Sequence, residues 1–154
     1  MKISIIGAGY VGLTTAACLS QIGNDVYCSE SDVDKLHMLQ AGVVPIFEPH
    51  LEDIIANSRK SGRLTFGSTE EAIDWGQAIF ICVGTPPLGN GDADLSAIEA
   101  LARMIAKRAN SYRLIVEKST VTVQTGVKLR KHLEAHRTRK LDYDVASNPE
   151  FLRE

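Results

Sequence analysis

The first thirty residues contain the most specific candidate binding site in the chain. Gly7-Ala8-Gly9-Tyr10-Val11-Gly12 is a G-x-G-x-x-G motif, and Glu30 lies 18 residues after Gly12. In such a motif Gly7 permits a tight turn, Gly9 lets a pyrophosphate approach the backbone, and Gly12 lets a helix pack closely on a sheet. A helix that begins there points N–H groups and its positive end at phosphate, and an acid at this spacing binds ribose hydroxyls. The pattern predicts a dinucleotide site.

The type of acid predicts which dinucleotide binds. A carboxylate at Glu30 would repel a 2′-phosphate, so we expect NAD and not NADP. A G-x-G-x-x-G alone is also found in plain glycine turns. Here a β-branched apolar run at 2–6 precedes it, a helical apolar pattern at 11–22 follows it, and a second apolar run at 26–28 leads to the acid. The strand, the glycine turn, the helix, the second strand and the acid therefore follow one another in the order that a dinucleotide-binding unit requires.

The same alternation continues along the whole chain and defines the fold class. Further strands are predicted at 63–66, 77–83, 112–117 and 143–147. Helices are predicted from Ser31 or Asp32 to near Gly42, over 50–58, from Ser68 or Thr69, from a cap at Asp94 to Ala109, and over 122–135. Alternating strands and helices indicate an α/β fold of the Rossmann type: a doubly wound, mainly parallel, six-stranded sheet with helices on both faces.

Polar residues that follow these strands are candidates for ligand contact, because ligands of open α/β sheets bind outside the carboxyl ends of strands. Thr85 follows the strand at 77–83, and Lys118-Ser119-Thr120 follows the strand at 112–117. Thr85 is equally well explained as a turn residue. Lys35, close in sequence to Glu30, is either a solvated helix lysine or a contact to a phosphate or ribose.

Composition excludes several classes of protein. The 154 residues suggest one domain, and the net charge of −2 gives no electrostatic case for nucleic acid or an anionic membrane. Cys18, Cys28 and Cys82 lie in apolar runs as small apolar residues, and their odd number favours reduced thiols in the cytoplasm. The glycines argue against a signal peptide, and no apolar run has membrane-spanning length. His132 and His136, four apart among basic residues, are expected at a solvated helix end and not on a metal.

Five spaced motifs resemble those of the nucleotide-sugar 6-dehydrogenases, the family that includes UDP-glucose and GDP-mannose 6-dehydrogenases. The segments are the glycine motif, Pro45-Ile46-Phe47-Glu48-Pro49, Cys82-Val83-Gly84-Thr85-Pro86, Glu117-Lys118-Ser119-Thr120-Val121 and Asn148-Pro149-Glu150-Phe151-Leu152-Arg153-Glu154. The resemblance covers the whole chain, in order. It implies oxidation of the C6 alcohol of a nucleotide sugar to a carboxylate with two NAD molecules.

The resemblance also implies roles for individual residues. The residues expected to contact NAD are Gly7, Gly9, Tyr10, Val11, Gly12, Glu30, Lys35, Thr85, Ser119, Thr120 and Glu154. Catalytic roles fall on Thr120 and Glu150, and the substrate would meet Glu150, Phe151, Leu152 and Glu154. If Asn148 caps a helix, Glu150 and Glu154 share a face of it. Without the resemblance they could simply be glutamates that suit the helix dipole.

Some features depart from the family pattern. Glu30 stands where the family usually has Asp, Thr122 replaces a proline and Gln124 a glycine. The family's second α/β domain and its cysteine nucleophile have no counterpart in residues 1–154. We therefore expect these residues to be the N-terminal NAD-binding part of a longer, homodimeric enzyme, and to be inactive alone. UDP-glucose is the expected substrate, with GDP-mannose as the alternative. A stand-alone NAD-binding module and a hydroxyacyl or phosphogluconate type of dehydrogenase are the other readings.

Overall fold

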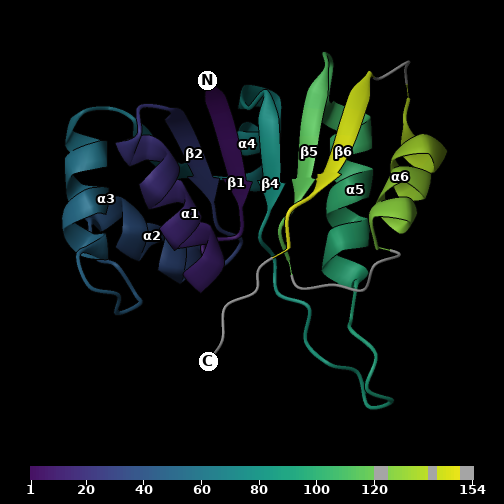
Figure 1. Ribbon diagram of the computed structural model, residues 1–154, viewed down its shortest axis with the longest axis horizontal. Coiled ribbons are helices and arrows are strands. Elements are labelled where there is room, and N and C mark those ends of the chain that lie inside the picture. Colours follow the sequence, from purple (N-terminus) through teal and green to yellow (C-terminus); the bar gives the residue numbers. More distant parts are fainter. Residues whose placement is uncertain (120–124, 139–141, 150–154) are drawn as a thin grey trace.

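The computed structural model describes residues 1–119, 125–138 and 142–149 and shows one twisted sheet between two layers of helices (Figure 1). Its strands are β1 (Lys2–Ile6), β2 (Asp25–Ser29), β3 (Leu64–Gly67), β4 (Ala78–Ile81), β5 (Arg113–Glu117) and β6 (Tyr143–Ser147). The order across the sheet is β3-β2-β1-β4-β5-β6, and all neighbours are parallel. The predicted Rossmann-type sheet is confirmed.

Helices connect the strands as the alternation predicted. They are α1 (Tyr10–Gln21), α2 (Val33–Ala41), α3 (Leu51–Lys60), α4 (Thr69–Trp75), α5 (Ser96–Arg108) and α6 (Thr125–His136). No helix in the described ranges is both long enough and apolar enough to cross a membrane.

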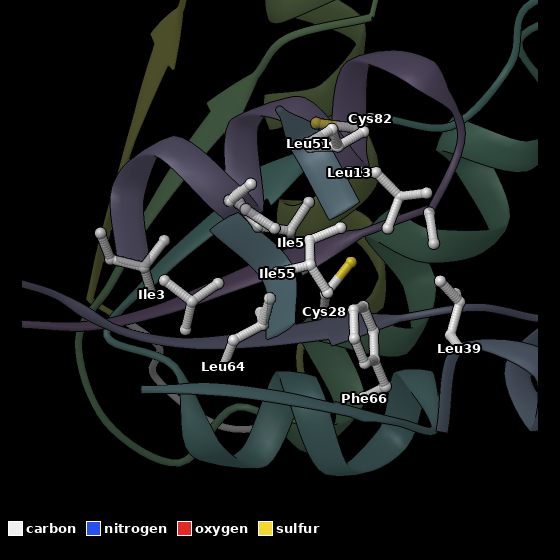
Figure 2. Packing of buried hydrophobic residues seen from close by; sticks show 14 of the residues in the cluster. Ile3, Ile5, Leu13, Cys28, Leu39, Leu51, Ile55, Leu64, Phe66 and Cys82 are labelled. Carbon is white, nitrogen blue, oxygen red and sulfur yellow. The ribbon is translucent and has the colours of Figure 1, made fainter. Parts of the chain in front are cut away.

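Two buried clusters hold the helices against opposite faces of the sheet. One joins β1, β2 and β3 to α1, α2 and α3 through residues such as Ile5, Leu13 and Ile55, each at most 2% exposed (Figure 2). The other joins β4 and β5 to α4, α5 and α6 through residues such as Ile79 and Ile105. Because both faces of β4 are covered, this central strand is apolar on both sides, as expected of a parallel sheet.

Capping side chains account for the start of several helices. Asp32 accepts a hydrogen bond from the Lys35 N–H at 3.0 Å at the start of α2, and Ser68 forms a reciprocal capping box with Glu71 at α4. The predicted cap at Asp94 was wrong by one residue: Leu95 is the N-cap of α5. The Asp94 carboxylate still accepts from the Ser96 N–H at 2.9 Å, and so satisfies one donor from a position further back.

Two apolar side chains near the end of α1 lie at the surface. Cys18 is exposed, and Ile22 is 75% exposed although the apolar pattern included it. The helix buries Leu13, Ala16 and Ala17, and position 18 lies about 100° around the helix from position 17, beyond the edge of that face. Ile22 follows the last turn as the C-cap, where the chain turns toward β2.

Candidate functional site

The glycine turn between β1 and α1 has the geometry that close packing and ligand approach require. Gly7 has a φ of +100°, and its N–H donates to the Ser29 carbonyl at 3.0 Å. A Cβ on Gly12 would lie 1.8 Å from the Gly7 carbonyl oxygen, so no side chain fits there. A Cβ on Gly9 would have no atom within 4 Å. Two of these glycines are thus needed by the fold, while the third leaves open space.

A pocket of about 270 Å³ lies at the start of α1, at the carboxyl edge of the sheet. Gly9 is the N-cap of α1 and makes no side-chain capping bond, and no acidic residue occupies the first turn of this helix. A helix start of this kind attracts anions through its main-chain donors and its dipole. The pocket is lined by Gly9, Tyr10, Val11, Cys82, Val83, Gly84, Thr85, Lys118 and Ser119, so four predicted site residues outside the glycines meet here: Tyr10, Val11, Thr85 and Ser119.

Glu30 follows β2 directly and is held rigidly in place. Its Oε1 accepts from the N–H groups of Ser31 at 2.7 Å and Asp32 at 3.2 Å, and its Oε2 lies 2.9 Å from Lys35 Nζ. Burial by itself would raise the pKa of this carboxyl, but the hydrogen bond and charge of Lys35 and the main-chain donors together hold the pKa below its ordinary value. Lys35 is therefore paired with Glu30 and is not a freely solvated helix lysine.

Ser119 links the segment after β5 to the end of β4 by hydrogen bonds. Its hydroxyl donates to the Val83 carbonyl at 2.7 Å, and its N–H donates to the Ile81 carbonyl at 3.1 Å. Lys118 donates from its main chain to the same carbonyl at 3.0 Å, and its Nζ lies 3.4 Å from Asn148 Oδ1. Ser119 therefore shapes the pocket wall while its hydroxyl is engaged within the protein.

Sequence reasoning missed two glutamates near this edge. Glu117, the last residue of β5, is 1% exposed, and within the described residues neither carboxylate oxygen has a hydrogen-bond partner. Burial raises the pKa of this carboxyl to about 7. Glu48 accepts a hydrogen bond from Tyr10 OH. Both glutamates lie in segments that resemble the family, Glu48 between two prolines and Glu117 at the end of an apolar strand, but neither was assigned a role.

Several predicted site residues lie outside the described ranges. They are Thr120, Glu150, Phe151, Leu152 and Glu154, together with the departures at Thr122 and Gln124. Of the two histidines, His132 lies 3.5 Å from Glu99, and His136 contacts the His132 carbonyl. Within residues 1–119, 125–138 and 142–149, no group of three metal-ligating side chains is brought together.

The residues present fit a dinucleotide. The open space at Gly9 and the helix start beside it suit a diphosphate, and the fixed carboxylate of Glu30 is an acceptor at the end of the neighbouring strand. Both features arise from strands at the centre of the sheet, which is where doubly wound folds bind such ligands.

Comparison with known proteins identifies the family. The model of the UDP-glucose/GDP-mannose dehydrogenase family, NAD binding domain, matches residues 1–154. The chain is 43% identical over 154 residues to UDP-glucose 6-dehydrogenase TuaD of Bacillus subtilis, covering 99% of this chain and 33% of that protein. It is 44% identical over 156 residues to UDP-glucose 6-dehydrogenase of Rhizobium meliloti, covering 100% of this chain and 36% of that protein.

Solved structures agree with this match. A UDP-glucose dehydrogenase from Pyrobaculum islandicum superposes with a TM-score of 0.93 at 38% identity, covering 100% of this chain and 37% of the other. A GDP-mannose dehydrogenase from Pseudomonas aeruginosa, solved as a ternary complex, gives a TM-score of 0.92 at 37% identity over the same shares. The chain spans about a third of the length of the curated relatives it matches. It belongs to the UDP-glucose/GDP-mannose dehydrogenase family and corresponds to that family's NAD-binding domain.

Proposed function

We propose that this chain is the cofactor-binding part of an NAD-dependent nucleotide-sugar 6-dehydrogenase that converts the C6 alcohol of UDP-glucose to a carboxylate. The observation that carries the proposal is the combination of the open glycine turn with the Glu30–Lys35 pair at the end of the neighbouring strand. UDP-glucose is favoured because the relatives compared above are UDP-glucose 6-dehydrogenases. GDP-mannose is the second candidate, because a GDP-mannose dehydrogenase superposes almost as well.

Each part of the described site has a task in this proposal. Gly9 and the start of α1 bind the diphosphate, Glu30 accepts hydrogen bonds from ribose hydroxyls, and Val11 and Thr85 contact the cofactor along the pocket. When bound, NAD supplies the hydride acceptor. Oxidation of a primary alcohol to a carboxylate removes two hydrides and consumes one water, so the whole reaction needs two NAD molecules.

The remaining roles rest on the family resemblance. Thr120 and Glu150 would act on the substrate, with Glu150 moving protons, while Phe151, Leu152 and Glu154 would contact substrate and Glu154 also NAD. Homodimer formation, a cytoplasmic location and the place of residues 1–154 at the N-terminus of a longer enzyme are further parts of the proposal. A stand-alone NAD-binding module is the alternative if no catalytic part accompanies this chain.

The isolated chain is expected to bind NAD but to lack dehydrogenase activity. Cys28 is fully buried, and burial raises the pKa of its thiol, so it is a poor nucleophile. Cys82 is 8% exposed, and Cys18 lies on α1, which packs on the first buried cluster. Formation of NADH from UDP-glucose by this chain, lost on substitution of Cys82 or Cys28, would contradict this assignment.

Calorimetric titration with NAD and NADP tests the cofactor assignment. We expect NAD to bind more tightly, because the Glu30 carboxylate repels a 2′-phosphate. Glu30→Ser should weaken NAD binding about tenfold and narrow the difference from NADP, since Lys35 is then available to a phosphate. Glu134→Ser, which removes a carboxylate from an ion pair with Arg137 on α6, is the matched control and should change neither affinity. Equal or tighter binding of NADP to the unsubstituted chain would contradict the proposed preference for NAD.

A further inference from the structure

Tyr10 connects the phosphate turn to a distant segment of the chain. It is the first residue of α1, lines the 270 Å³ pocket, and remains 43% exposed. Its hydroxyl donates to Glu48 Oε2 at 2.6 Å, across 38 residues of sequence. A hydrogen bond of this length to a carboxylate is of the strong, charge-assisted kind.

The segment that carries Glu48 is itself firmly placed. Residues 43–49 join α2 to α3 at the same edge of the sheet as the start of α1 (Figure 1). Val44 and Ile46 pack against the first buried cluster, and the Glu48 carbonyl accepts from the Leu51 N–H at 3.1 Å, at the start of α3. Prolines at 45 and 49 restrict the backbone on both sides of this stretch. Glu48 is thus anchored by the core before it and by a helix after it.

We propose that Glu48 is a positioning residue for the cofactor pocket, acting through Tyr10. An exposed tyrosine at a helix start samples several rotamers, and a ligand that needs one of them must restrict the others at a cost of about 0.5–1.5 kcal/mol. The bond to Glu48 restricts the Tyr10 ring before the ligand arrives. This inference rests on the proposed NAD binding and adds to it a residue that touches no cofactor.

The experiment is a double-mutant cycle read by NADH fluorescence on the 154-residue chain. Tyr10→Phe and Glu48→Ala should each weaken NADH binding about three- to tenfold, the range that the loss of one preset side chain gives. The double variant should bind NADH no more weakly than the weaker-binding of the two single variants, because Tyr10→Phe and Glu48→Ala remove the same interaction. Glu48→Gln keeps an acceptor oxygen and should restore most of the affinity. A residue with a merely structural role would not show this rescue at an unchanged melting temperature.

Tyr112→Phe is the matched control. Tyr112 OH also donates to a carboxylate, that of Asp144 at 3.0 Å, but at the opposite end of β5 from the pocket. It should leave NADH affinity unchanged. Tighter binding by both Glu48 variants would mean that the carboxylate acts on the ligand by repulsion and would overturn the inference, as would additive losses in the double variant. Failure of the unsubstituted chain to bind NADH would instead sink the proposed function, and with it this extension.

Discussion

Two glutamates at the ends of parallel strands have opposite environments. Glu30, directly after β2, has donors on both carboxylate oxygens, and its pKa lies below the ordinary value. Glu117, at the end of β5, has no partner within the described residues, and burial raises its pKa to about 7. Residue type and place in the sheet are alike, so the available donors make the difference. The Glu30 carboxylate is thus held by an ion pair and by main-chain donors, whereas the main chain of Ser119 only partly opposes the effect of burial on Glu117.

The most severe test of the part built on β1 and β2 is Gly12→Val. Its Cβ would meet the Gly7 carbonyl oxygen at 1.8 Å, and backbone on both sides leaves nothing that can move cheaply. We expect a loss of at least about 3 kcal/mol in the free energy of unfolding, measured by chemical denaturation. A variant that folds with unchanged stability would show that the turn is looser than its geometry indicates.

Gly9→Val should separate binding from folding. The added side chain meets no atom within 4 Å, and the backbone at φ −72° is one that valine adopts, so the melting temperature should stay unchanged. The same side chain would fill the space into which the diphosphate fits, so NAD affinity should fall at least about 100-fold, or about 2.7 kcal/mol. Gly126→Val, at another open glycine position on α6, is the control and should bind normally. Normal binding by Gly9→Val would contradict the phosphate assignment.

Glu117→Gln tests the effect of the buried carboxyl at the end of β5. Because the folded-state pKa is raised from 4.5 to about 7, the folded protein binds more protons than the unfolded chain between these values. The free energy of unfolding therefore falls as pH rises from 4.5 to about 7 and levels off above that. The amide carries no charge, so the variant should be more stable than the unsubstituted chain at pH 8 by about 3 kcal/mol, and similar to it at pH 4.5.

Denaturant titrations at pH 4.5, 6 and 8 provide the measurement, with Glu134→Gln on the exposed face of α6 as the control. Parallel pH dependences for Glu117→Gln and the unsubstituted chain would mean that the carboxylate is compensated after all.

Glu30→Gln should give the smallest effect and one of opposite sign. The pKa of Glu30 is lowered, so its ionised form stabilises the fold above the ordinary pKa, and this contribution is lost as pH falls through the lowered value. The variant should be less stable by about 1 kcal/mol at pH 7 and nearly equal at pH 3. If instead it were more stable at pH 7, the pair with Lys35 would cost more in desolvation than it returns.

Local patterns in the sequence predicted most of the fold and several of the residues that line the pocket. The glycine spacing, Glu30 and the alternation of strands and helices are short-range signals, and they named the sheet and the turn correctly. The exposure of Cys18 could not be predicted, because a run of apolar residues does not define which helix face meets the sheet. The bond from Tyr10 to Glu48 depends on a loop returning after 38 residues, and the state of Glu117 depends on which donors surround it. Neither is encoded by spacing.

The division of the core has a consequence for synthesis of the chain. Every buried member of the first cluster lies within residues 3–82, whereas the second cluster needs residues up to 133. A chain made from its N-terminus can therefore assemble β1, β2 and β3 with three helices before β5 exists. During that interval the edge of β4 that later pairs with β5 is open, and an open strand edge can join a neighbouring chain. The time that a ribosome takes to reach β5 therefore limits how long this edge is exposed in a nascent chain.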